Sequence, residues 1–361
     1  MNMIEGVAMQ HHNYMEAAEY IKSQREHIAE RIMQEGGIYL YQDYTGYQID
    51  KCRQDTLYNL QYLAESLMIE STGLWENYII WLRILLSSLG LGMQGLSEHF
   101  RVMGDVLIPL LDHPAAEFVK RLTGSAAKLV LDDAPDLSFT QESTGEYAER
   151  SRQYQELLLS AQKRKALKYI DQLIDDGIPF RNIYLDIIQP VQREIGNLWH
   201  RNKISVAQEH YCTGVSQLVI AHMYPRMFNA SPSKYKVVST CVHGELHELG
   251  LRMVTDIMEL DGWDTYYLGA NMPNDSILSM LKAQKADLLA ISVTFPLNLH
   301  KAEELVSLVR QDKDLQPLKI MVGGYAFMQD TALWQKIRAD SFAPNADIAS
   351  KVASSLLEGI K

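Results

Sequence analysis

One polar loop of the sequence carries a histidine and a carboxylate at a spacing suited to metal ligation. Residues 236–250 read KVVSTCVHGELHELG and contain Glu245, His247 and Gly250. Neutral imidazole is a good transition-metal ligand, and a carboxylate that accepts its other ring N–H fixes the tautomer and raises its basicity. Gly250 would leave room for a bulky ligand against the backbone. The loop is a candidate metal site, although a surface histidine capping a helix would give the same pattern.

The residues around this loop predict a strand before it and a helix after it. Residues 237–240 form a short β-branched run that is typical of a buried strand. A helical pattern follows, with apolar residues three and four positions apart on one face: Leu246, Leu249, Met253, Ile257 and Leu260. His247 should therefore lie just past the carboxyl end of a strand, where open α/β sheets bind ligands.

Two more stretches predict buried strands that end in small or hydroxylated residues. Residues 287–294 (DLLAISVT) end in Ser292 and Thr294, and residues 318–322 are followed by Gly323 and Gly324. A glycine pair after a strand is ordinary turn punctuation by itself. The three elements follow one another in a βαβ pattern, which predicts a parallel sheet.

This arrangement resembles the cobalamin-binding domain of corrinoid proteins. The order Glu245-x-His247-x-x-Gly250 matches its signature, and the resemblance implies that His247 is the lower axial ligand of the cobalt. Cobalamin is therefore the expected cofactor.

The resemblance extends to the two later strands. It implies that the hydroxyls of Ser292 and Thr294 contact the nucleotide tail of the cofactor. It also implies that Gly323 and Gly324 give this tail room to enter the sheet.

The region before the sheet reads as helices with a tight connection. Residues 183–199 form one helical pattern, and Pro190 inside it predicts a kink near residues 186–190. Ser205 and Gln208 fit a capping box that starts the next helix. Trp199 and Glu209 should then lie close together across a short loop.

The spacing of Trp199, Glu209 and His210 resembles the helix-bundle cap of cobalamin-dependent photoreceptors. The resemblance implies that Trp199 packs against a 5′-deoxyadenosyl group, that Glu209 contacts it, and that His210 moves onto the cobalt after photolysis. Adenosylcobalamin is accordingly the expected form. The alternative is that Trp199 belongs to the bundle core and that the two charged residues only start a helix, where an acid is favoured anyway.

Composition narrows the class of protein. The 361 residues are 47% hydrophobic and 22% charged, which is ordinary for globular domains. The net charge of −11 disfavours a broad nucleic-acid surface, so DNA binding is not expected. Three cysteines without metal-type spacing, and no apolar run long enough to span a bilayer, predict a soluble cytoplasmic protein.

The predicted fold is α plus α/β, in three domains. We expect an all-helical domain over 1–131, a polar linker over 132–146, a four-helix-bundle cap over 147–230, and a flavodoxin-like parallel sheet over 231–361. The first domain lacks the winged-helix pattern of light-sensing repressors. It is expected to serve as a surface for a partner or a second copy, or else as a pocket for a second chromophore such as a bilin (biliverdin) or haem. Its histidines carry no specific motif: His11, His12, His27 and His99.

The sequence therefore predicts a cobalamin-dependent light sensor that signals to a partner or another subunit. It carries no P-loop, dinucleotide fingerprint, kinase motifs or nucleophile elbow, so no catalytic residue is assigned. The main alternative is a corrinoid carrier for methyl transfer, as a component of a methyltransferase system. A radical isomerase would need a substrate barrel on a partner subunit.

Overall fold

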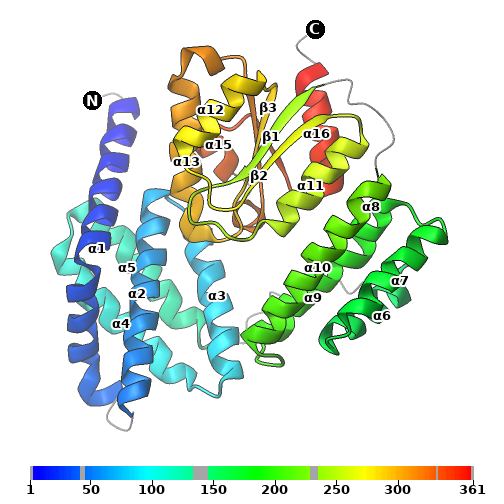
Figure 1. Ribbon diagram of the computed structural model, residues 1–361. Helices are drawn as coiled ribbons and strands as arrows, with labels where there is room; N and C mark the ends of the chain where they lie inside the picture. The colour runs from blue at the N-terminus through cyan, green and yellow to red at the C-terminus, as the bar shows by residue number, and fades with distance from the viewer. Residues whose placement is uncertain (1–2, 41–44, 133–144, 228–234, 331, 359–361) are drawn as a thin grey trace. The chain divides into compact units, whose positions relative to one another are not determined.

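The computed structural model describes residues 3–40, 45–132, 145–227, 235–330 and 332–358 (Figure 1). They form two compact units. The N-terminal unit comprises Met1–Asp136 together with two later segments, Phe295–His300 and Gln329–Leu333. The C-terminal unit comprises Leu137–Thr294, Lys301–Met328 and Trp334–Lys361. Most of the expected linker, residues 133–144, lies outside the described residues.

The N-terminal unit is helical, as the sequence predicts. Its elements are α1 (Met3–Leu40), α2 (Gly46–Met68), α3 (Thr72–Ser88), α4 (Met93–Leu107), the 3-10 turn η1 (Ile108–Leu110) and α5 (His113–Leu129). Side-chain caps start two of the helices. Thr45 and Gln48 form a capping box at α2, and Ser71 accepts from the backbone of Leu74 at α3.

Helix α3 is strongly apolar and buries one face in the core of this unit. Trp75 and Ile79 are fully buried, and the Trp75 indole N–H donates to the Leu122 carbonyl at 2.7 Å. Tyr62 and Tyr78 stack with their ring centroids 3.6 Å apart. No helix in the described part of the chain combines the length and apolar character that crossing a bilayer requires.

A polar network is buried among these aromatic rings. The Tyr78 hydroxyl donates to Asn59 Oδ1 at 2.6 Å, and Asn59 Nδ2 lies 3.2 Å from His99 Nε2. Burial lowers the pKa of His99 to about 4. The side chains of His11 and His12 lie outside the described residues, so of the N-terminal histidines His99 is the one the structure places in a core.

Acid should weaken the N-terminal unit through His99. Because its folded pKa lies below the ordinary value of 6.5, the unfolded chain binds more protons. Stability is therefore complete above about pH 6.5 and falls toward pH 4, by up to about 3 kcal/mol. Amide exchange of α4 should show this slope in the wild type and a flatter one in His99→Gln. The exposed His27→Gln variant should keep the wild-type slope, and equal slopes in all three proteins would contradict the assignment.

The C-terminal unit begins with a bundle of four helical segments. These are α6 (Ala148–Leu159), α7 (Lys163–Asp175), a composite third segment, and α10 (Val206–Met227). The third segment joins α8 (Phe180–Asn182), the π-helical η2 (Ile183–Ile188) and α9 (Gln189–His200). The π-helical stretch ends two residues before Pro190, which cannot donate to the helix ladder. The predicted irregularity is thus a change of helical register.

A five-stranded parallel sheet follows, as Figure 1 shows. Its strands are β1 (Lys236–Cys241), β2 (Asp264–Gly269), β3 (Leu288–Ser292), β4 (Lys319–Gly323) and β5 (Ser341–Ala343). The order is β2-β1-β3-β4-β5, which is the flavodoxin-like order. The sequence predicts β1, β3 and β4 individually but not the two edge strands.

Helices cover both faces of the sheet (Figure 1). On one face, α11 (Leu249–Leu260) and α16 (Ala346–Glu358) pack against Val237, Leu288 and Met321. The other face carries α12 (Asn274–Gln284) and α13 (Leu299–Gln311), and two short helices follow β4, α14 (Tyr325–Met328) and α15 (Leu333–Lys336). Burial on both faces explains why β3 and β4 read as largely apolar runs.

Candidate functional site

The register of the strands brings the predicted residues to one edge of the sheet. Cys241 pairs with Ser292, and Ser292 pairs with Gly323, so the last residues of β1, β3 and β4 form one row. The chain reverses its direction of winding between β1 and β3, which makes this the topological switch point where such folds bind ligands.

The loop after β1 holds His247 with its ring toward solvent. The His247 Nδ1 lies 2.6 Å from Glu245 Oε1, and the His247 backbone N–H donates to the same oxygen at 3.0 Å. A carboxylate only accepts, so Nδ1 carries the hydrogen and a neutral ring keeps its lone pair on Nε2. The side chain is 63% exposed. This is the hydrogen bond that the sequence predicts, and it leaves one nitrogen available to a metal.

Glu245 also holds a second part of the site. It is fully buried, and its Oε2 accepts from the Thr294 backbone N–H at 3.0 Å. Its backbone carbonyl accepts from Asn271, whose side-chain oxygen accepts from Gly244. The sequence analysis missed Asn271, which follows the unpredicted strand β2 and has a left-handed backbone (φ +55°). The sequence signal for this turn was an asparagine placed shortly after a glycine at the end of a strand, because asparagine and glycine are common in turns.

Negative charge around His247 raises the pKa of its ring. The hydrogen bond to Glu245 is the main cause, burial opposes it, and Glu209 on α10 adds to it. Acid competes with a metal for Nε2, because a protonated ring has no lone pair to give.

Cys241 is a second possible metal ligand at this edge of the sheet, but its thiol would bind a metal poorly. Burial raises the pKa of its thiol to about 12, and the carboxylates of Glu245 and Glu248 act in the same direction. A thiol must lose its proton to bind a metal tightly. Cys241 is therefore a neutral core residue beside the loop.

The three predicted glycines differ in their surroundings. A Cβ at Gly250 would meet no atom within 4 Å, so the space beside it is open. At Gly324, where φ is +93°, a Cβ would lie 2.4 Å from the Val293 carbonyl oxygen. At Gly323 it would lie 3.0 Å from the Ala343 carbonyl oxygen. Glycine is thus required at Gly324 by the close approach of neighbouring backbone, whereas a Cβ at Gly323, the last residue of β4, would only be tight.

The helix after the loop begins later than expected. It starts at Leu249, because residues 242–248 are used to hold the buried Glu245 carboxylate between His247 and Thr294. Leu246, which the periodicity assigned to the buried face, lies in the loop and is 72% exposed.

The bundle places Trp199, Glu209 and His210 around a tight turn. The capping box is confirmed: Gln208 N–H donates to Ser205 Oγ at 3.2 Å, and the Gln208 side chain accepts from the Ser205 backbone at 3.0 Å. Trp199 is half-buried in the last turn of α9. Glu209 pairs with His210 Nδ1 at 2.6 Å, and the His210 side chain is 76% exposed.

The donor set fits a metal that arrives with ligands of its own. Within the described ranges, no three His, Cys, Asp or Glu side chains gather in a way that could hold a metal ion. A bare ion needs several protein ligands, whereas a cobalt in a corrin ring needs only one axial nitrogen. His247 offers that nitrogen beside open space at Gly250, so the residues present fit a corrinoid.

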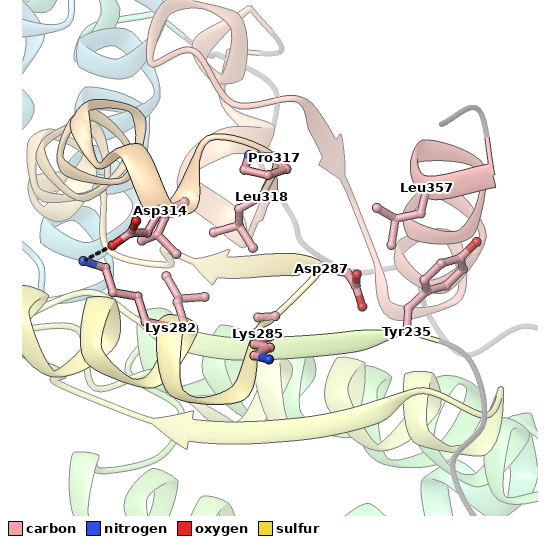
Figure 2. A pocket seen from close by; sticks show the side chains of 11 residues that line it. Tyr235, Lys282, Lys285, Asp287, Asp314, Pro317, Leu318 and Leu357 are labelled. Atoms are coloured by element: carbon pink, nitrogen blue, oxygen red, sulfur yellow. Dashed lines mark ion pairs between the residues drawn. The ribbon is translucent and has the colours of Figure 1, made fainter. Parts of the chain in front are cut away.

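A pocket of about 620 Å³ lies at the opposite edge of the sheet. Figure 2 shows that Tyr235, Asp287 and Leu318 reach it from just before β1, β3 and β4. Lys282 on its rim lies 3.6 Å from Asp314 and 2.6 Å from Asp312. The Lys282 ammonium group is already paired, and the loop that holds His247 lies at the other ends of the strands, so the pocket is not part of the candidate site.

Two regions of the chain match models of known protein families. A B12 binding domain model matches residues 235–352, and a second B12 binding domain model matches residues 151–224. The first match covers the sheet and its helices, and the second covers most of the helical bundle. Cobalamin or a related corrinoid is therefore the ligand that these matches support.

Named relatives are corrinoid proteins. Dimethylamine corrinoid protein 3 of Methanosarcina acetivorans is 25% identical over 205 residues, which are 55% of this chain and 93% of that protein. A corrinoid protein of Desulfitobacterium hafniense is 22% identical over 48% of this chain and 84% of that protein. The monomethylamine corrinoid protein of Methanosarcina barkeri, a solved structure, covers 58% of this chain and all of its own, with 18% identity and a TM-score of 0.53. That likeness shows the fold.

These relatives support only part of what the sequence analysis expected. Cobalamin binding is supported. A photoreceptor, an adenosyl group on the cobalt and a bilin chromophore gain no support from proteins named for methylamines and corrinoids.

Proposed function

We propose that this protein is a corrinoid carrier for methyl transfer, with His247 as the lower axial ligand of the cobalt. The observation that supports the ligand is the Glu245–His247 pair, which presents one ring nitrogen at the switch point of the sheet. The corrinoid relatives support methyl cargo. When bound, the corrinoid supplies a cobalt that can accept a methyl group and give it up.

The chain's own residues hold and tune the cofactor. Glu245 fixes the tautomer of His247 and makes Nε2 a stronger donor. Ser292, Thr294, Gly323 and Gly324 are proposed to receive the nucleotide tail, since the strand register and the Glu245 contact gather them at the same edge.

A carrier needs separate proteins to donate and accept the methyl group, so we propose methyltransferase subunits as partners. The N-terminal unit is proposed to serve such a partner or a second copy of the chain.

Methylation of the bound cobalt tests the carrier directly. The full chain would be loaded with cobalamin, reduced to the Co(I) state and treated with methyl iodide in the dark. A carrier should form protein-bound methylcobalamin at a rate within about tenfold of the free cofactor. Wild-type protein that binds cobalamin but blocks this reaction would contradict a carrier with an accessible upper face.

Illumination of the adenosylcobalamin complex tests the competing hypothesis of a light sensor. The sensor hypothesis depends on His210, whose ring is exposed and lies beside Glu209. A lasting bis-histidine spectrum after illumination of the adenosylcobalamin complex, lost in His210→Ala, would favour the sensor. A photoproduct like that of free cofactor in both proteins would favour the carrier.

A further inference from the structure

The end of the edge strand β2 contacts the loop that carries His247. Gly269 is the last residue of this strand, and Ala270 and Asn271 follow it; we call these three residues the β2 clamp. The clamp and the loop both belong to the C-terminal unit. Their contacts lie on both sides of His247 in the sequence, so they bear on how its ring is held.

Asn271 holds the loop before His247. Residues 242–245 form a tight turn, which a backbone hydrogen bond of 3.0 Å closes. Asn271 joins this turn twice, because its backbone N–H donates to the Glu245 carbonyl at 3.0 Å and its Oδ1 accepts from the Gly244 N–H at 2.8 Å. The buried Glu245 carboxylate bonds His247, so its position is tied to Asn271.

Ala270 holds the loop after His247. Its backbone N–H donates to Glu248 Oε2 at 2.9 Å. Gly269 leaves the space for this carboxylate, since a Cβ there would lie 2.7 Å from the same oxygen. Glu248 is the last residue before α11, so this contact fixes the point at which the loop becomes a helix.

The backbone of β2 is irregular where the clamp begins. Its pairing with β1 is regular up to Tyr267 and then skips Leu268, so that Gly269 pairs with Thr240. A bulge redirects a strand, and bulges are common beside active sites. Gly269 and Asn271 both have left-handed backbones, with φ of +76° and +55°. Glycine adopts this conformation freely and asparagine tolerates it, so the path that brings the clamp to the loop depends on these two residue types.

We propose that Asn271 is a positioning residue for the axial ligand His247. Through the turn it sets the Glu245 carboxylate, and that carboxylate fixes the ring and its tautomer. The ring is thus oriented before a corrinoid arrives, and less conformational freedom is lost when it binds. This inference rests on the proposed role of His247 as the lower axial ligand.

The test separates the side chain of Asn271 from its backbone conformation. Asn271→Gly keeps the left-handed backbone but removes the oxygen that accepts from Gly244. Asn271→Asp keeps an accepting oxygen at the same position. Thr265→Val is the matched control, because it removes a side-chain hydrogen bond of the same strand, from Thr265 Oγ1 to Glu259 Oε2 at 3.0 Å, away from the loop.

Cobalamin affinity, and amide exchange without cofactor, would be measured on the full chain for wild type and the three variants. Asn271→Gly should bind cobalamin about two- to tenfold more weakly, which is the contribution of one hydrogen bond. In its Co(II) complex, electron paramagnetic resonance should show the axial nitrogen splitting for a smaller share of the cobalt. Without cofactor, residues 243–248 should exchange faster than in wild type. Asn271→Asp and Thr265→Val should stay within about twofold of wild type in affinity and in exchange of this loop.

Unchanged exchange of residues 243–248 in Asn271→Gly would overturn the positioning role even if the carrier function holds. Equal losses of affinity in Asn271→Gly and Asn271→Asp would also overturn it, because the accepting oxygen would then not matter. A wild-type protein that supplies no axial nitrogen would instead overturn the assignment of His247, and the role of Asn271 with it, while leaving methyl transfer to be judged by the methyl iodide reaction.

Discussion

Cobalamin bound to His247→Ala is expected to lose its protein-derived axial nitrogen and to bind at least about tenfold more weakly. Removing a residue that only supports a metal ligand lowers metal affinity by about 10- to 100-fold. Removing the ligand itself should lower the affinity at least as much. The decisive measurement is the electron paramagnetic resonance spectrum of the Co(II) form in nitrogen-15-labelled protein. The axial splitting should change from a triplet to a doublet in wild type, because the ligand nitrogen comes from the protein.

Two variants sharpen this experiment. His243→Ala removes another exposed histidine of the same loop and should bind cobalamin like wild type. Glu245→Gln keeps the volume but loses the charge that makes His247 a strong donor, so its affinity should fall by about 10- to 100-fold. If the axial splitting stays a triplet in the nitrogen-15-labelled wild-type protein, the ligand nitrogen does not come from the protein and His247 is not the ligand.

Gly324→Ala is expected to destabilise the C-terminal unit by about 2–5 kcal/mol. A left-handed backbone costs a residue with a Cβ about 1–2 kcal/mol. The new Cβ would also lie 2.4 Å from the Val293 carbonyl oxygen, and forcing such an overlap costs about 1–3 kcal/mol more. Amide exchange of β4 in the full chain, measured as denaturant is added, reports the loss in this unit.

Gly250→Ala is the matched control for this substitution. It lies in the first turns of α11 with no atom near its Cβ, so unfolding should change by no more than about 1 kcal/mol. Cobalamin affinity should nevertheless fall, because the added methyl enters the space proposed for the corrin ring. An unchanged stability in Gly324→Ala would show that the two backbones can separate there without cost.

Much of the fold could be predicted from local pattern. The β-branched run before Cys241 and the apolar run before Ser292 indicate buried parallel strands, and the Ser205–Gln208 spacing indicates a helix start that the structure confirms. Such signals succeed because strand burial and helix capping depend on residues a few positions apart. The pairing of Glu245 with His247, two residues away, is local in the same way.

Local patterns gave wrong predictions at positions where contacts between residues distant in sequence decide the structure. Leu246 has the spacing of a buried helical residue, yet the chain stays in a loop there because Glu245 must reach both His247 and Thr294. The edge strand β2 and the Asn271 that follows it were missed because an edge strand is less completely buried and reads less clearly.

By itself, then, the sequence determined the donor chemistry of this protein: an imidazole with its carboxylate in a loop after a strand, followed by hydroxyl and glycine positions. The tertiary structure alone decided how these parts are joined. Glu245 meets Thr294 across 49 residues, and Glu65 meets His300 across 235. The physical reason is that periodicity reports only which face of an element is buried, whereas the partner of a buried charge is chosen by packing of the whole chain.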